Sequence, residues 1–394
     1  MPSAVGVLFA ARAVRGFGDG FALIILPAYL SAIGFGAAEI GIVATSALLG
    51  SALTTLAVGF LAPRLDMRSL MLLGAILMAA TGLFLPGFEH FVFIAVVAFI
   101  GTMNPSAGDI GMLVPLEHAM LARAVADAAR TRTFARYSLI GALASAVGAL
   151  AAATPDLLVS AGMTRIGAFR AMFYLYAACG LASAALYRRL PYAQGDAARS
   201  AALGPSRGVV YKLAALFSLD AFAGGFAVQA LVALWLFVRF DLSIATASVF
   251  FFWATLLGAF SLPVAAWLAN RIGLVNTMVF THIPSSICLI LAAFSSDLVL
   301  VLTLLLMRAA LSQMDVPTRT SYVMAVVTPP ERAAAASVTA VPRTLASSVS
   351  PAVAGVLMST PFTGLPLVVC GCLKIVYDLA LLLMFRKVRP PEER

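Results

Sequence analysis

Charged side chains inside long apolar stretches are the residues of this 394-residue sequence that could do chemistry. Arg15 and Asp19 are spaced i, i+4, so on a helix they share one face and can pair. Asp220 follows Arg15 by 220 − 15 = 205 positions, in a second apolar stretch. A charge at the centre of a membrane costs at least about 2.5–3.5 kcal/mol, so chains seldom keep such groups without using them. We expect Arg15 to alternate between Asp19 and Asp220, which would make a two-state gate.

A second pair of carboxylates lies in two further apolar stretches, at Asp109 and Asp315, which are 315 − 109 = 206 positions apart. Nearby prolines free backbone carbonyls and bend a helix, and broken helices with buried carboxylates are where transporters bind ions or protons. Alternatively, each aspartate is paired with an arginine, as Asp315 could be with Arg319 or Arg308. The candidates for solute or proton contact are Arg15, Asp19, Asp109, Glu117, Asp220, Arg308, Gln313 and Asp315.

Two other spacings are interpreted as structural. Lys374 and Asp378 are i, i+4 and should pair along one helix face. Met278 and His282 have the same spacing, but a metal site needs several convergent donors, and packing is the commoner role of such a pair. The four cysteines lie inside apolar segments and read as small buried residues. We therefore expect neither a metal nor another cofactor.

The composition places these residues in a membrane. The chain is 62% hydrophobic and 11% charged, whereas a soluble domain is about half apolar and about a quarter charged. Apolar segments of helical length recur throughout, and the short alternating segments of membrane β-barrels do not. The sequence has neither a glycine-rich nucleotide-binding pattern nor a set of residues for a hydrolytic triad, which argues against ATP-driven transport and against an enzyme.

The apolar segments predict an all-α integral membrane protein with twelve transmembrane helices. Eighteen Lys and Arg residues fall in the even-numbered connections and the C-terminal tail, against three in the odd-numbered ones. By the positive-inside rule, both termini lie in the cytoplasm, in a bacterial-type plasma membrane. The formal charge of +9 is thus a signal of topology rather than of nucleic-acid binding. The expected spans are about 5–32, 39–62, 69–87, 91–118, 137–158, 169–188, 209–237, 244–268, 274–294, 298–324, 343–360 and 365–385.

The two halves of the chain repeat one another at an offset of about 206 residues. Arg64 and Arg271 each follow a long apolar segment and are 271 − 64 = 207 positions apart, and Arg136 and Arg343 have the same offset. A repeat built from membrane spans is the usual plan of a secondary transporter. We therefore predict two pseudo-symmetric six-helix bundles, residues 1–190 and 209–394, joined by a cytoplasmic linker at 191–208.

This layout resembles the major facilitator superfamily over essentially the whole chain. The superfamily carries a glycine-x-x-x-aspartate-arginine-x-glycine-arginine pattern between helices 2 and 3, of which Gly59 and Arg64 match here. Pro63 replaces the aspartate, while Asp66 stands at the glycine position. The second copy keeps Arg271 and has Asn270 at the acidic position. The resemblance implies that Arg64, Asp66 and Arg271 act in the cytoplasmic gate.

The resemblance also implies rocker-switch alternating access around a cavity lined chiefly by helices 1, 4, 7 and 10. With buried carboxylates in place, we expect secondary active, proton-coupled export of a small polar or charged solute by a monomer in the lipid bilayer. One alternative is a metal or inorganic ion transporter of the same fold. Another is a membrane sensor or scaffold that no longer transports. The partners expected are the solute, protons and lipid, without nucleic acid.

Overall fold

The computed structural model describes residues 4–61, 64–106, 111–193, 203–328 and 331–385. Within these segments the regular elements are helices, and no strand forms among them. An apolar chain in lipid must satisfy its backbone groups internally, which a helix does within one segment. The all-α fold predicted from the sequence is therefore confirmed.

The helices divide into two compact units, residues 1–197 with 228–255 and residues 198–227 with 256–394. Helix α11 (Ile244–Ile272) contributes its first part to one unit and its last part to the other. The first unit otherwise contains α1 (Ala4–Ala32), α2 (Ala37–Leu61), α3 (Met67–Phe84), the 3-10 helix η1 (Leu85–Gly87), α4 (Phe91–Ile100), α5 (Leu113–Ala124), α6 (Asp127–Ala151), α7 (Thr154–Ser160), α8 (Arg165–Tyr187) and α10 (Gln229–Phe240). The second contains α9 (Arg207–Gly225), α12 (Leu274–Phe294), α13 (Leu298–Ser312), α14 (Asp315–Val326), α15 (Arg332–Met358) and α16 (Leu365–Phe385).

Ten helical segments within the described residues are long and apolar enough to cross a membrane, and α4 is a shorter apolar helix. The protein is thus a multi-pass membrane protein, and the count of twelve spans stays a prediction. Four expected spans are interrupted. The span predicted at 91–118 is divided into α4 and α5, the one at 137–158 into α6 and α7, the one at 209–237 into α9 and α10, and the one at 298–324 into α13 and α14.

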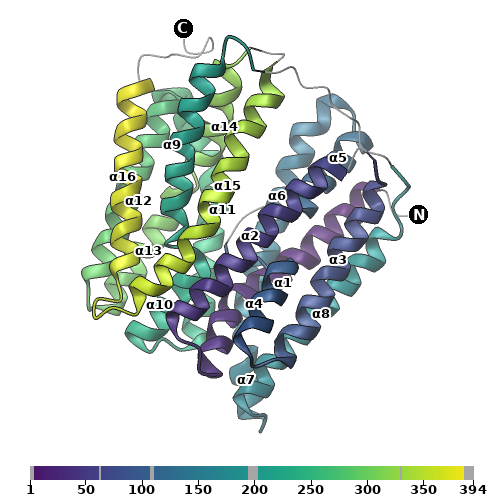
Figure 1. Ribbon diagram of the computed structural model, residues 1–394, viewed down its shortest axis with the longest axis vertical. Coiled ribbons are helices and arrows are strands. Elements are labelled where there is room, and N and C mark those ends of the chain that lie inside the picture. The colour runs from purple at the N-terminus through teal and green to yellow at the C-terminus, as the bar shows by residue number, and fades with distance from the viewer. Residues whose placement is uncertain (1–3, 62–63, 107–110, 194–202, 329–330, 386–394) are drawn as a thin grey trace. The chain divides into compact units, whose positions relative to one another are not determined.

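Close glycine contacts hold each unit together and repeat between the halves. In the first unit, α1 packs along α6, and a Cβ on Gly20 would overlap the carbonyl of Ser145. In the second, α9 packs along α15 (Figure 1), and a Cβ on Gly225 would overlap the side chain of Ser350. Both residues of the pair recur at one offset, since 225 − 20 = 205 and 350 − 145 = 205. The sequence repeat therefore preserves a close helix contact in which a glycine lies against a serine.

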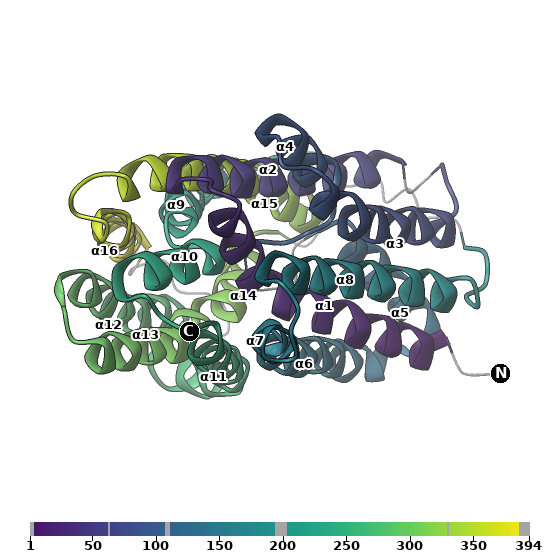
Figure 2. The same ribbon diagram turned by 90° about the horizontal axis from the view of Figure 1, so that it is seen from below.

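The remaining helices give each unit its own apolar core. In the first unit α3 packs against α8, and α1 lies against α8 and α6. In the second, α12 packs against both α13 and α16 (Figure 2). A buried cluster around Met71, Leu121 and Tyr187 fills the first unit, and one around Met278, Tyr322 and Leu381 fills the second. The charged side chains described below are inserted into these two cores.

Candidate functional site

Glu117 is the centre of a buried polar cluster in the first unit. Its carboxylate is fully buried and forms an ion pair with the Arg15 guanidinium of α1. The Tyr137 hydroxyl of α6 donates to Glu117 Oε2, and the Tyr187 hydroxyl of α8 donates to Oε1 at 2.6 Å. Arg12 lies over the Tyr137 ring, with Cζ 5.3 Å from the ring centroid. One carboxylate on α5 thus joins four helices, which makes its charge tolerable in an apolar core.

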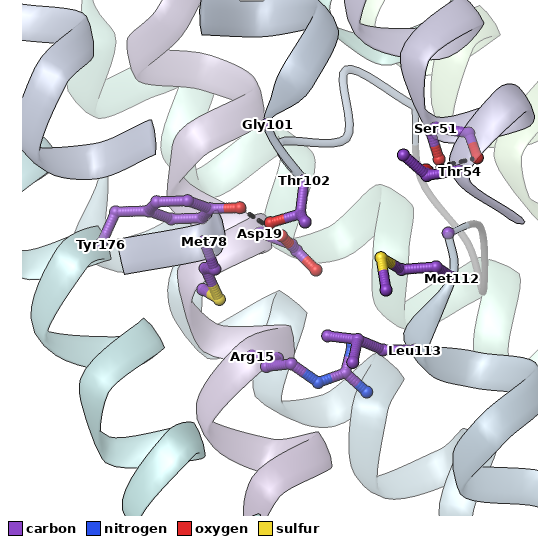
Figure 3. A pocket seen from close by; sticks show the side chains of 11 residues that line it. Arg15, Asp19, Ser51, Thr54, Met78, Gly101, Thr102, Met112, Leu113 and Tyr176 are labelled. Atoms are coloured by element: carbon purple, nitrogen blue, oxygen red, sulfur yellow. Dashed lines mark hydrogen bonds between the residues drawn. The ribbon is translucent and has the colours of Figure 1, made fainter. Parts of the chain in front are cut away.

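A pocket opens beside this cluster and contains two of the three charged residues of α1. Arg15 and Asp19 line it together with polar residues of α2 and the ring of Tyr176 (Figure 3). The Tyr176 hydroxyl donates to Asp19 Oδ1 at 3.3 Å. Arg15 is 5% exposed, and its Nε has no hydrogen-bond partner among the described residues. The pocket therefore offers a buried cationic donor and a carboxylate one helical turn apart, a combination suited to a polar or charged solute.

Asp220 is the centre of a second buried cluster, in the other unit. Its Oδ1 accepts from Lys374 Nζ of α16 at 2.7 Å, and its Oδ2 accepts from Arg319 Nη1 of α14 at 3.0 Å. Arg319 also pairs with Asp315 at 3.1 Å, one helical turn away. Asp315 is therefore paired with Arg319, as that alternative expected, while the role of Asp315 in proton coupling stays a prediction. Asp220, Asp315 and Arg319 are each at most 5% exposed.

His282 of α12 extends this cluster. Its Nδ1 lies 3.1 Å from both carboxylate oxygens of Asp378, and its Nε2 lies 3.1 Å from Lys374 Nζ. Nε2 is also 3.8 Å from Asp220 Oδ1. Lys374 and Asp378 were expected to pair with each other along α16. Instead, Lys374 binds Asp220 and Asp378 binds His282, because facing helices supply partners at shorter range. Among the described residues, no three His, Cys, Asp or Glu side chains form a group that could hold a metal.

The two clusters use corresponding helices with opposite polarity. The first unit has the cation, Arg15, on its first helix and the anion, Glu117, on α5. The second has the anion, Asp220, on α9 and the cation, Arg319, on α14. Arg15 and Asp220 are repeat equivalents, while Glu117 and Arg319 are 319 − 117 = 202 positions apart. Each charge thus finds its partner within its own unit. The expected pairing of Arg15 with Asp220 would join the two units and stays a prediction.

Of the expected gate residues, Arg64 and Asp66 lie between two spans and Arg271 lies in the last turn of α11, and they make different contacts from one another. Asp66 caps α3 by accepting from the Ser69 amide at 2.9 Å, and it accepts from the Ala193 amide at 2.7 Å. Burial raises the pKa of Asp66, but these amide hydrogen bonds outweigh it and hold the pKa below the usual value. Arg64 is exposed in the turn before Asp66, and exposed Arg271 lies over Trp267, with Cζ 4.4 Å from the ring centroid.

Glu331 makes a comparable anchor in the second unit, which sequence reasoning missed. Its carboxylate accepts from Ser206 Oγ at 2.6 Å, from Thr328 Oγ1 at 2.5 Å and from the Gly204 amide. These hydrogen bonds lower the pKa of Glu331 to about 2. Asp66 and Glu331 therefore hold the two ends of the linker segment, at Ala193 and at Gly204.

The other predicted residues fall outside both clusters. Arg308 is half-buried on α13, and its backbone carbonyl accepts from Ser285 Oγ at 3.4 Å. Gln313 is exposed at the end of α13, where the helix is interrupted. Asp109 lies outside the described residues. The partners that sequence reasoning missed are Tyr137, Tyr187 and His282. Tyrosines in an apolar stretch carry no charge to mark them, whereas His282 was noticed and interpreted as packing.

A comparison with known families accounts for this arrangement. The family model described as Major Facilitator Superfamily matches residues 8–238. The chain belongs to the major facilitator superfamily. Membership of this family makes the protein a membrane transporter, as expected from the loop motif and the repeat.

Full-length likenesses agree with membership of the major facilitator superfamily. The uncharacterized membrane protein YJR124C of Saccharomyces cerevisiae is 24% identical over 97% of this chain and 94% of its own length. The inward-open xylose transporter XylE from E. coli superposes with a TM-score of 0.77 at 13% identity, covering 99% of this chain and 98% of that one. The nucleoside transporter NupG gives 0.75 at 14% identity, covering 98% and 100%. At these identities the structural likeness shows the fold alone.

Proposed function

We propose that this transporter moves a small polar or charged solute by alternating access and that protons drive it, in the direction of export. The observation that carries the proposal is the pair of buried ionic clusters, one in each unit, at repeat-equivalent helices. Each ion pair connects the first helix of its half to the helix that follows a break, α5 or α14. An ion pair between two helices can be formed or broken, and these two states would give the helices the two arrangements that alternating access requires.

The pocket beside Arg15 supports a polar or charged solute. It presents a guanidinium and a carboxylate on one helix and hydroxyl groups on others (Figure 3). A purely apolar solute would leave these groups without hydrogen-bond partners on losing water, which is costly in a buried site. We propose Asp19 as the solute-contacting carboxylate, and Asp315 and Asp109 as residues for proton coupling.

The distribution of Lys and Arg between the two sides of the membrane supports a plasma-membrane location for this transporter. The bias of Lys and Arg toward even-numbered connections favours cytoplasmic termini and a bacterial-type plasma membrane. The internal repeat completes two halves within one chain, so we propose that a monomer transports. We further propose that residues 191–208 form a cytoplasmic linker between the two halves.

Flux in proteoliposomes tests the proposed function. The purified full chain is reconstituted with a pH-sensitive dye inside, and amines, carboxylates, amino acids and sugars are offered in turn under an imposed pH gradient. We expect one class of solute to be transported against its own concentration gradient while protons cross the membrane down the imposed pH gradient. A charge crossing 100 mV is worth about 2.3 kcal/mol, ample for concentrating a small solute.

The variant Asp19→Asn supplies the matched test of the pocket. Its flux should fall at least about tenfold, because a charge-assisted contact worth about 1.5–3 kcal/mol is lost. Glu89→Gln, which changes an exposed carboxylate paired with Arg170, serves as the control and should transport normally. A solute that binds without proton-dependent flux would favour a sensor over a transporter, and inward accumulation would refute export.

A further inference from the structure

We propose that His282 and Asp378 form the proton-binding site of this protein and that protonation transfers Asp220 from Lys374 to His282. The inference rests on the proposed proton coupling and assigns it to residues on α12 and α16. These residues are not among the carboxylates expected from the sequence. Both side chains are buried, with His282 2% exposed and Asp378 fully covered.

The partners of the imidazole fix its neutral form. Lys374 carries three donors and no acceptor, so its Nζ can bond to His282 Nε2 at 3.1 Å only if Nε2 is unprotonated. The single ring proton of neutral His282 must then lie on Nδ1, where it donates to the Asp378 carboxylate at 3.1 Å. The structure therefore defines one tautomer of neutral imidazole, with its lone pair held by an ammonium group.

A second proton on the ring is incompatible with that contact. When hydronium donates a proton to Nε2, one O–H bond breaks, one N–H bond forms and a water molecule is left, without any redox change. Two donors, N–H and ammonium, would then face each other at 3.1 Å. Nε2 already lies 3.8 Å from Asp220 Oδ1, the oxygen that Lys374 also binds. The imidazolium can thus take over this carboxylate oxygen while Lys374 withdraws.

The charges of the cluster around His282 favour the uptake of one proton. Contacts within 4.0 Å join three carboxylates to one arginine and one lysine, which leaves a single negative charge that a proton on His282 neutralises. A buried cluster is more stable when its charges balance. The titratable groups packed around this cluster are Asp220 on α9, Asp315 and Arg319 on α14, Arg343 on α15, and Cys370, Lys374, Tyr377 and Asp378 on α16, while Arg308 on α13 interacts with Cys370.

The withdrawal of Lys374 acts on the end of α9. A Cβ on Gly224 would lie 3.8 Å from Lys374 Nζ, so the ammonium lies against the last turn of this helix. The helix ends one residue later at Gly225, ahead of the interruption at Phe226–Val228. A change in the position of Lys374 therefore alters the contacts of α9 where it is interrupted. Lys374 would therefore couple proton binding at His282 to a rearrangement at the end of α9.

The test follows the imidazole directly, by nitrogen NMR of the full chain in nanodiscs with ¹⁵N-labelled histidine. The sequence has only three histidines, so single variants H90Q, H118Q and H282Q assign every ring signal. We expect the His282 signals to report an Nδ1-protonated neutral ring at high pH and an imidazolium ring once the pH is lowered enough to protonate Nε2. A ring that keeps one form throughout, or that is Nε2-protonated when neutral, would overturn the proposal.

Two further variants keep the test independent of how well H282Q folds. Asp378→Asn should remove the preference for the Nδ1-protonated form, because an amide can accept or donate. Lys374→Met should let neutral His282 adopt the Nε2-protonated form by facing Asp220. If both variants keep the wild-type tautomer, the assignment fails.

Flux measurements separate this inference from the proposed function. Normal proton-dependent flux in H282Q, with an unchanged number of protons per solute, would refute only the His282 site. A His282 that titrates in a protein without proton-dependent flux for any solute would refute the coupling. H90Q is the control in both measurements, because His90 is exposed at the start of α4.

Discussion

Glu117 illustrates at the residue scale how a buried charge depends on its partners. Its carboxylate receives the guanidinium of Arg15 and two tyrosine hydroxyls. Glu117→Gln keeps the shape and removes the charge, which leaves Arg15 buried beside a neutral amide. Breaking a buried pair in this way costs about 3–5 kcal/mol, so we expect a marked fall in the free energy of unfolding.

Thermal unfolding in detergent, followed by intrinsic fluorescence, measures this effect. Glu89→Gln breaks an ion pair of similar chemistry, with Arg170 at 3.1 Å, but at the surface. Exposed pairs contribute about 0–1 kcal/mol, so this control should unfold close to the wild-type temperature. Equal losses in the two variants would show that Glu117 is no more than a replaceable polar side chain.

The sequence identified the buried charged residues individually, but it did not predict most of their partners. Arg15, Glu117, Asp220 and Asp315 stood out because a charge in an apolar stretch is rare. The contacts of the first three cross between helices that lie far apart in the chain, and spacing within one helix carries no information about them. Asp315 instead pairs within its own helix with Arg319, one of the two arginines considered from the sequence. The i, i+4 spacing of Lys374 and Asp378 was misleading, because Asp220 on a facing helix offers Lys374 a partner at 2.7 Å.

At the scale of elements, glycine decides how closely the helices approach. Gly20 on α1 meets the carbonyl of Ser145, and Gly225 on α9 meets Ser350. Gly20→Ala should force α1 away from α6 and destabilise the protein by about 1–3 kcal/mol, as overpacking does. Gly59→Ala in α2 is the matched control, because a Cβ there meets nothing within 4 Å and alanine favours helix.

The same comparison can be made in both halves. Unfolding temperatures of Gly20→Ala, Gly225→Ala and Gly59→Ala should fall in the first two and stay constant or rise in the third. Small residues near Arg15 admit a close neighbour, which the structure identifies as α6. Where the helices are interrupted was less predictable, since Phe226–Val228 contains no proline to mark the end of α9.

At the scale of the whole molecule, Glu331 makes stability depend on pH. Hydrogen bonds from Ser206, Thr328 and Gly204 lower its pKa from 4.5 to about 2. The stabilisation is therefore complete above about pH 4.5 and is lost as the pH falls toward 2. We expect the unfolding temperature of the wild type to fall between pH 5 and pH 3 more steeply than that of Glu331→Gln.

Unfolding curves collected across this pH range measure the difference. Glu89→Gln should keep the wild-type steepness, because its carboxylate lies in an exposed pair. Parallel curves for the wild type and Glu331→Gln would show that another carboxylate controls acid unfolding. The fold itself, with its repeat and membrane spans, was predictable from composition and periodicity, whereas these anchors depend on contacts with the linker ends.

The two linker anchors determine where the chain could be cut. Asp66 holds Ala193, and Glu331 holds Gly204 and Ser206, so each anchor joins residues of a single unit. A break in the polypeptide between positions 193 and 204 would leave both anchors intact, and a break before 193 or after 206 would separate one anchor from its partner. A two-piece version of this protein should therefore be encoded as two fragments that divide between positions 193 and 204.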